Sequence, residues 1–62
     1  MTRLNVNGII CEVTMNEWYR YTAVHVREER DGKFVRVDNL EGQGNDAFQA
    51  AFNLKRKVLR AG

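Results

Sequence analysis

The chain has 62 residues, of which 29% are charged, with a formal net charge of +2, one cysteine and one histidine. This length predicts a single small domain spanning residues 1–62. The core of so short a chain is marginal and is often supplemented by oligomerisation. One cysteine excludes an internal disulfide, and one cysteine with one histidine argues against a zinc site. We expect no cofactor and no metal.

The pattern of apolar residues predicts no membrane segment. No apolar run approaches the roughly 18 residues that a transmembrane helix needs. The first residues, MTRLNVNG, lack the apolar stretch of a signal peptide. We therefore expect a cytoplasmic protein that does not contact a membrane. The mildly basic charge permits contact with nucleic acid without requiring it.

The dipeptide Asn7-Gly8 predicts the first turn of an antiparallel sheet. Asn-Gly is the preferred sequence of a two-residue type I′ turn, because both central residues need positive φ. The hairpin pairs Val6 with Ile9, Leu4 with Cys11 and Thr2 with Val13. The apolar side chains of both strands then share one face. We expect Cys11 to be an unreactive thiol in the core.

The dipeptide Asp31-Gly32 predicts a second two-residue turn, between EWYRYTAVHVREER (17–30) and KFVRVDNL (33–40). The expected pairs are Arg30 with Lys33, Glu28 with Val35, Val26 with Val37 and Val24 with Asn39. This register directs four valines towards a covering helix: Val24, Val26, Val35 and Val37. We expect Val26 and Val37 to be buried against Leu54 and Val58.

The last third of the chain predicts an amphipathic helix of about fifteen residues from Asp46, with Asn45 as the N-cap. One apolar stripe contains Ala47, Ala51, Leu54 and Val58. A second contains Phe48, Phe52 and Leu59. The predicted fold is α+β: a four-stranded antiparallel meander (β-β-β-β-α) with one C-terminal helix packed on one face.

The segment LEGQGNDAF, between the last strand and the helix, has two interpretations. A helix N-terminus after glycines can bind a phosphate, but Glu41 and Asp46 oppose an anion, and the lysine of a phosphate-binding loop is missing. We favour a structural role, in which Gly42 and Gly44 let the chain reverse between strand and helix.

The segment LEGQGNDAFQAAFNLKRKVL, read with YTAVHVREERDGKFVRV before it, resembles the β-β-α portion of the double-stranded-RNA-binding domain. The resemblance covers about the C-terminal two-thirds. It implies that alanines of the helix pack on the sheet. In that family lysines at the start of the second helix grip phosphates, whereas this chain has Asn45, Asp46 and Gln49. The family's first helix is replaced by the hairpin around Asn7-Gly8.

The sheet face away from the helix is one candidate binding surface. Its expected members are Tyr19, Tyr21, His25, Arg27, Phe34 and Arg36. Arg27 opposite Arg36 would favour an anionic ligand or an acidic partner. Aromatic and arginine side chains together suit single-stranded nucleic acid and suit a protein interface equally. They are also ordinary residues of a solvated sheet face.

His25 is expected to lie across from Asp38. A carboxylate beside an imidazole can make the charge of the pair depend on pH near neutrality. The alternative is an exposed cross-strand pair of small energetic value.

The helix is the second candidate surface. Lys55 separates the two apolar stripes, so one stripe can cover the sheet while the other meets a second copy of the chain. The expected homodimer interface contains Phe48, Phe52, Lys55 and Leu59. The alternative is that Lys55 lies at the edge of the core and extends its ammonium group to water.

No catalytic constellation emerges from the sequence, so we expect a non-enzymatic binding module. The interpretation we favour is a protein-binding regulator or inhibitor, of the kind that phages and mobile elements encode as short chains, with a host or defence protein as partner. The alternative is a small nucleic-acid-binding protein that uses the Tyr/Arg face of the sheet.

Overall fold

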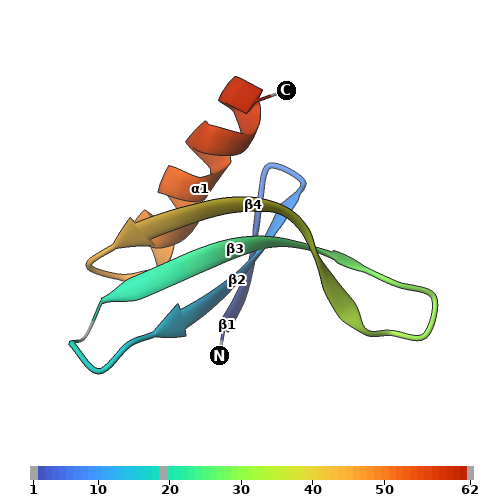
Figure 1. The fold of residues 1–62 in the computed structure, drawn as a ribbon, viewed down its shortest axis with the longest axis horizontal. Coiled ribbons are helices and arrows are strands. Elements are labelled where there is room, and N and C mark those ends of the chain that lie inside the picture. The colour runs from blue at the N-terminus through green and yellow to red at the C-terminus, as the bar shows by residue number, and fades with distance from the viewer. Residues whose placement is uncertain (1, 19, 62) are drawn as a thin grey trace.

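The computed structural model describes residues 2–18 and 20–61, and Figure 1 shows a twisted sheet crossed by one helix. In chain order the elements are β1 (Thr2–Val6), β2 (Ile9–Met15), β3 (Tyr21–Glu28), β4 (Phe34–Gly44) and α1 (Ala47–Ala61). Neighbouring strands are antiparallel and follow the order β1-β2-β3-β4. The predicted α+β meander with a C-terminal helix on one face is confirmed.

The β1–β2 hairpin has the predicted turn and register. Asn7 and Gly8 have positive φ values of 53° and 88°, as a type I′ turn requires. The pairs include Val6–Ile9, Leu4–Cys11 and Thr2–Val13. The Gly8 N–H donates a hydrogen bond of 2.8 Å to Asn5 Oδ1 across the turn. The asparagine–glycine sequence therefore determines the register of the first half of the sheet.

The β3–β4 hairpin closes with a three-residue loop, so the predicted two-residue turn is wrong. The Gly32 N–H donates to the Glu29 carbonyl at 2.9 Å, and the Glu29 N–H donates to the Lys33 carbonyl at 2.7 Å. Within this loop only Gly32 has a positive φ, of 84°. The loop is therefore a type I turn followed by a glycine in the left-handed region. Near the turn, the β3–β4 register is one residue away from the predicted one.

A bulge in β4 shifts the register again. The two pairs that flank it are Val26–Arg36 and Val24–Glu41. One residue of β3, His25, therefore lies opposite residues 37–40 of β4. The predicted pairs Val26–Val37 and Val24–Asn39 are both wrong. Extra residues bend the bulged strand, and β4 is visibly curved in Figure 1.

The observed register inverts the predicted faces of β3. The pairing with β2 aligns Cys11 with His25 and Val13 with Ala23. Residues that lie directly opposite in a sheet share a face, so Ala23 and His25 are on the face that α1 covers. The prediction that Val24 and Val26 face the helix is therefore wrong.

Val26 and Val37 do not pack against α1, contrary to the prediction that they meet Leu54 and Val58. Val26 is buried, with 5% of its surface exposed, but lies outside the cluster around the helix. It shares the open face with Ile10, its partner on β2. Val37 is in the bulge and is 45% exposed.

Small residues let α1 approach the sheet closely. The buried cluster contains Cys11, Val13, Ala23, Ala50, Ala51 and Leu54. Gly42 and Gly44 lie under the helix, and a Cβ atom on Gly42 would overlap the Ala50 carbonyl oxygen and the Leu54 nitrogen. Both glycines belong to β4, which was predicted to end at Leu40, and neither has a positive φ. The role of these two glycines is structural, as predicted. They leave space for the close approach of α1, however, and do not reverse the chain.

The N-cap of α1 is Asp46, one residue after the predicted Asn45. The Gln49 N–H donates a hydrogen bond of 2.7 Å to Asp46 Oδ1. The carboxylate thus satisfies one of the free N–H groups of the first turn. It also occupies the position where a phosphate would have to bind, which removes the phosphate interpretation of this helix N-terminus.

Candidate functional site: the exposed surface of the helix

The described residues bring no metal-binding group together. Cys11 is fully buried, and burial raises the pKa of its thiol above the ordinary value. Its Sγ lies 3.9 Å from the Ala51 carbonyl oxygen, in the core. Residues 2–18 and 20–61 contain no group of three His, Cys, Asp or Glu side chains that could hold a metal ion. In the same residues, no helix is long and apolar enough to cross a membrane.

The predicted Tyr/Arg surface is divided between the two faces of the sheet. Through the pairings with β2 and β4, Tyr21 and His25 are on the helix side, whereas Phe34 and Arg36 are on the open face with Val26. Tyr19 lies outside the described residues. The prediction that these side chains form one surface is therefore wrong, and a binding role for each of them separately stays a prediction.

The two arginines of that surface do not face each other. Arg27 lies opposite Val35, and its guanidinium contacts the Glu29 carboxylate at 3.1 Å. Arg36 contacts the Glu41 carboxylate at 3.1 Å. Each arginine is paired with a carboxylate. The expected repulsion between the two arginines, which would have favoured an anion between them, is therefore absent. Phe34 is covered in turn by Arg3, whose guanidinium carbon is 3.8 Å from the ring centre.

The predicted contact between His25 and Asp38 is present, but it is made through the bulge. His25 Nδ1 is 3.0 Å from Asp38 Oδ2, and the Leu40 N–H donates to Asp38 Oδ1 at 3.0 Å. Burial alone would raise the pKa of Asp38. The hydrogen bonds from His25 and Leu40, with the charges of His25 and Arg36, outweigh it and hold the pKa below its usual value. Asp38 thus organises the bulge.

An exposed apolar strip runs along one side of α1. Phe48, Phe52 and Leu59 are 74%, 49% and 63% exposed, and they lie within about 40° of one another around the helix axis. The Lys55 ammonium lies 4.9 Å from the centre of the Phe52 ring. We call Phe48, Phe52 and Leu59 the apolar flank. The other predicted stripe covers the sheet, with Ala51 and Leu54 buried and Ala47 and Val58 packed against the core.

Two further exposed apolar residues lie at the end of the sheet where α1 begins. Met15 is 52% and Trp18 is 76% exposed. Met15 pairs with Tyr21, which pairs with Gly44 just before the helix. The turn that carries Trp18 is at the same end in Figure 1. Sequence reasoning missed Trp18 because it placed this residue in the predicted strand 17–30, whereas β3 begins at Tyr21.

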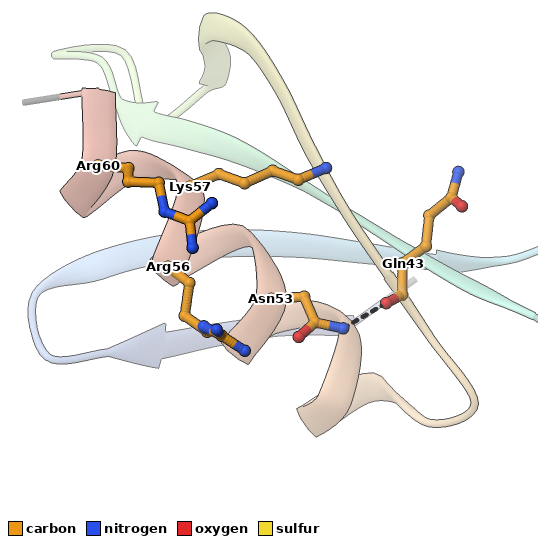
Figure 2. A pocket seen from close by; sticks show the side chains of 5 residues that line it. All are labelled: Gln43, Asn53, Arg56, Lys57 and Arg60. Carbon is orange, nitrogen blue, oxygen red and sulfur yellow. Dashed lines mark hydrogen bonds between the residues drawn. The ribbon is translucent and has the colours of Figure 1, made fainter.

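A polar hollow lies on the other side of α1, next to β4. It has a volume of about 280 Å³ and is lined by Gln43, Asn53, Arg56, Lys57 and Arg60. Figure 2 shows Asn53 and Lys57 extending towards the strand that carries Gln43, while the Arg56 and Arg60 side chains lie closer to the helix. We call these five residues the basic pocket. The sequence analysis did not identify it, because Gln43 joins the helix residues only when β4 extends past Leu40.

The charges of the chain are divided between sheet and helix. Residues 1–46 contain six Lys/Arg and eight Asp/Glu, whereas residues 47–62 contain four Lys/Arg and no Asp or Glu. The sheet portion therefore has a formal charge of −2 and the helix portion +4. Any anionic partner is attracted to the α1 side of the molecule.

Comparison with protein-family models, curated proteins and solved structures gives no match for this chain. The resemblance to the double-stranded-RNA-binding domain accordingly stays a prediction. The function has to be argued from the exposed surface of α1.

Proposed function

We propose that this chain is a small, non-enzymatic binding module that contacts another protein through the apolar flank of α1. The observation that carries the proposal is the exposure of Phe48, Phe52 and Leu59 on one side of a helix whose other apolar stripe is already packed. Phe48 and Phe52 are one helical turn apart and therefore neighbours on the helix surface, and exposed apolar patches mark interaction sites in soluble proteins. Phenylalanine is also among the residues enriched in interfaces.

Charge defines the partner that suits this surface. Lys55 borders Phe52, Arg56 follows it, and the helix portion has no acidic residue. A partner with an apolar groove and acidic side chains at its rim would match both features. Helix-in-groove contacts of this kind bury one face of a helix at spacings of three and four residues.

The proposal extends to a role as regulator or inhibitor. A chain of 62 residues that exposes two phenylalanines on one side of its helix can act by occupying a surface of its target. We propose a cytoplasmic regulator of the kind that phages and mobile elements encode, directed at a host or defence protein.

The proposal is tested by affinity capture from nuclease-treated lysate, followed by binding measurements with the purified captured protein. Phe48→Ser with Phe52→Ser should weaken binding by at least about 30-fold, because central aromatic residues contribute about 2 kcal/mol or more to interfaces. The matched control is Val35→Ser with Val37→Ser, which removes two exposed apolar side chains from β4 and should leave the affinity unchanged. Equal affinity for both double variants would contradict the proposal.

The homodimer predicted from the sequence uses the same flank and stays a prediction. A symmetric pair through Phe48 and Phe52 would bring together two helix portions of charge +4 each. We therefore expect any self-association to strengthen with salt, which screens the repulsion. Sedimentation at micromolar concentration distinguishes the 7.2 kDa monomer from a dimer, and Phe52→Glu should abolish the dimer. A dimer that resists this substitution would place the interface elsewhere.

A further inference from the structure

The basic pocket differs from an ordinary solvated helix face because two of its side chains are anchored. Asn53 Nδ2 donates a hydrogen bond of 2.6 Å to the Gln43 carbonyl, and Lys57 Nζ donates one of 2.7 Å to the Glu41 carbonyl. The first of these bonds is drawn in Figure 2. Gln49 Nε2 also donates to Asn53 Oδ1 at 3.4 Å. These bonds attach α1 to the outer edge of β4 and fix one wall of the pocket.

Within residues 2–18 and 20–61, no acidic side chain lines the pocket. Its lining includes Lys57 and two arginines one helical turn apart, Arg56 and Arg60. The nearest acidic residue along β4 is Glu41, whose carboxylate binds Arg36 and whose carbonyl accepts from Lys57. Among the described residues, Arg56 and Arg60 form no ion pair. Elsewhere Arg3, Arg27 and Arg36 are each paired with a glutamate.

We propose that the basic pocket binds the phosphate groups of a nucleic-acid backbone. Two guanidinium groups and an ammonium around one hollow provide the geometry that phosphate oxygens require, because an arginine donates two parallel N–H groups to one oxyanion. The pocket is open, so it would enclose little of a single small ligand. A polyanion gains further contacts along the helix and the entropy of released counterions.

This site is separate from the surface proposed above for a protein partner, and the inference does not rest on that proposal. Asn53 and Lys57 lie on the β4 side of α1, whereas Phe48 and Leu59 lie on the opposite side by the geometry of the helix. The sheet portion, at −2, would face away from the nucleic acid. Since phosphate contacts carry no sequence information, the expected binding is independent of base sequence.

The test is fluorescence anisotropy with labelled single-stranded and duplex DNA at 50 and 200 mM salt. With about three phosphate contacts, the affinity for the duplex should fall about 40-fold over this range. Arg56→Gln with Arg60→Gln should reduce that dependence to about 4-fold, since each lost contact lowers the salt slope by about one unit. Circular dichroism should show an unchanged fold, because both side chains are exposed.

The matched control is Arg30→Gln with Lys33→Gln, which removes the same charge from the β3–β4 loop, at the far end of the hairpin from α1. It should keep the 40-fold salt dependence. The proposal is overturned if the wild type does not bind DNA at 50 mM salt, or if both double variants lose binding equally. It is also overturned if a polyglutamate peptide binds as tightly as DNA, or if only inorganic phosphate shifts the NMR signals of Arg56 and Arg60.

Discussion

At the scale of single residues, Gly42 determines how closely the helix and sheet can pack. A Cβ atom at this position would meet backbone atoms of α1, including the Leu54 Cα at 2.8 Å. Backbone atoms cannot move aside as the end of a flexible side chain can. The helix would have to shift as a whole, which loosens the contacts of Ala50 and Leu54, both fully buried.

We therefore expect Gly42→Ala to destabilise the domain by about 3 kcal/mol, the upper part of the range for overpacked cores. In a chain of 62 residues this is a large part of the total stability. Urea unfolding followed by circular dichroism measures it. The control is Gln43→Ala at the next residue, which is exposed. It should lower the free energy of unfolding by less than about 1 kcal/mol. A stable Gly42→Ala variant would mean that α1 lies further from β4.

Two valines of neighbouring strands test the assignment of sheet faces. Val37 is 45% exposed and Val26 is 5% exposed. We expect Val37→Asp to change the free energy of unfolding by less than about 0.5 kcal/mol, as is usual at exposed positions. Val26→Asp should unfold the domain, because an unpaired charge in the interior costs several kcal/mol. Thermal melts measure the stability of both variants. A Val37→Asp variant that fails to fold would mean that Val37 is buried against the helix, as the predicted register had placed it.

At the scale of elements, the β4 bulge is organised by one carboxylate. Asp38 accepts a hydrogen bond from the Leu40 N–H and contacts His25. Its pKa is lower in the folded protein than the ordinary value of 3.8. Folding therefore favours the ionised form, and the resulting stability is fully present above the unfolded pKa and is lost as the pH falls through the folded one.

We expect Asp38→Asn to lower the stability by about 1 kcal/mol at pH 7, the usual net value of a hydrogen bond. Asparagine keeps an acceptor for Leu40, but it removes the charge and replaces the Oδ2 that contacts His25 Nδ1 with an amide nitrogen. The difference between the wild type and the variant should shrink as the pH falls below 4, where the wild-type carboxylate becomes protonated. Urea unfolding at pH 7 and pH 2.5 measures both differences. A difference that is constant with pH would show that the charge of Asp38 is not involved.

The two hairpins show what local sequence can predict and what it cannot. Asn7-Gly8 requires positive φ at two residues, so the first register followed from the turn alone. Asp31-Gly32 is compatible with both a two-residue and a three-residue loop, and only Gly32 takes positive φ. In the bulge at residues 37–40, Asp38 contacts both the Leu40 N–H and His25 of β3. The His25 contact was predicted, but the extra residues of β4 were not.

The prediction of which β3 side chains face α1 was wrong because it considered only hydrophobicity and not the space available beneath the helix. Val24 and Val26 are more apolar than Ala23 and His25, so alternation directed the valines towards the helix. α1 approaches β4 closely over Gly42, and Ala23, the partner of Gly42 on β3, is fully buried in the cluster beneath the helix. On α1 itself, the exposure of Phe48 and Phe52 agrees with the second stripe read from the sequence. The basic pocket was not predicted, because β4 was expected to end at Leu40 and so did not reach Gln43.

At the scale of the whole molecule, the two proposed contacts divide the exposed surface of α1. The apolar flank lies on one side of the helix, and the basic pocket lies on the other, next to β4. The sheet has a formal charge of −2. Because the two proposed contacts use separate sides of α1, the two proposals together would let a protein and a nucleic acid bind at the same time.

The central claim, that the apolar flank meets a partner protein, is tested most directly by photocrosslinking. A benzoylphenylalanine at position 52, and at position 35 as an equally apolar control, would be irradiated in nuclease-treated lysate. We predict a protein adduct from position 52 and none from position 35. Unlabelled wild type should compete for it and unlabelled Phe48→Ser should not. An adduct from position 35 alone, or one that Phe48→Ser competes for as well as the wild type, would contradict the claim.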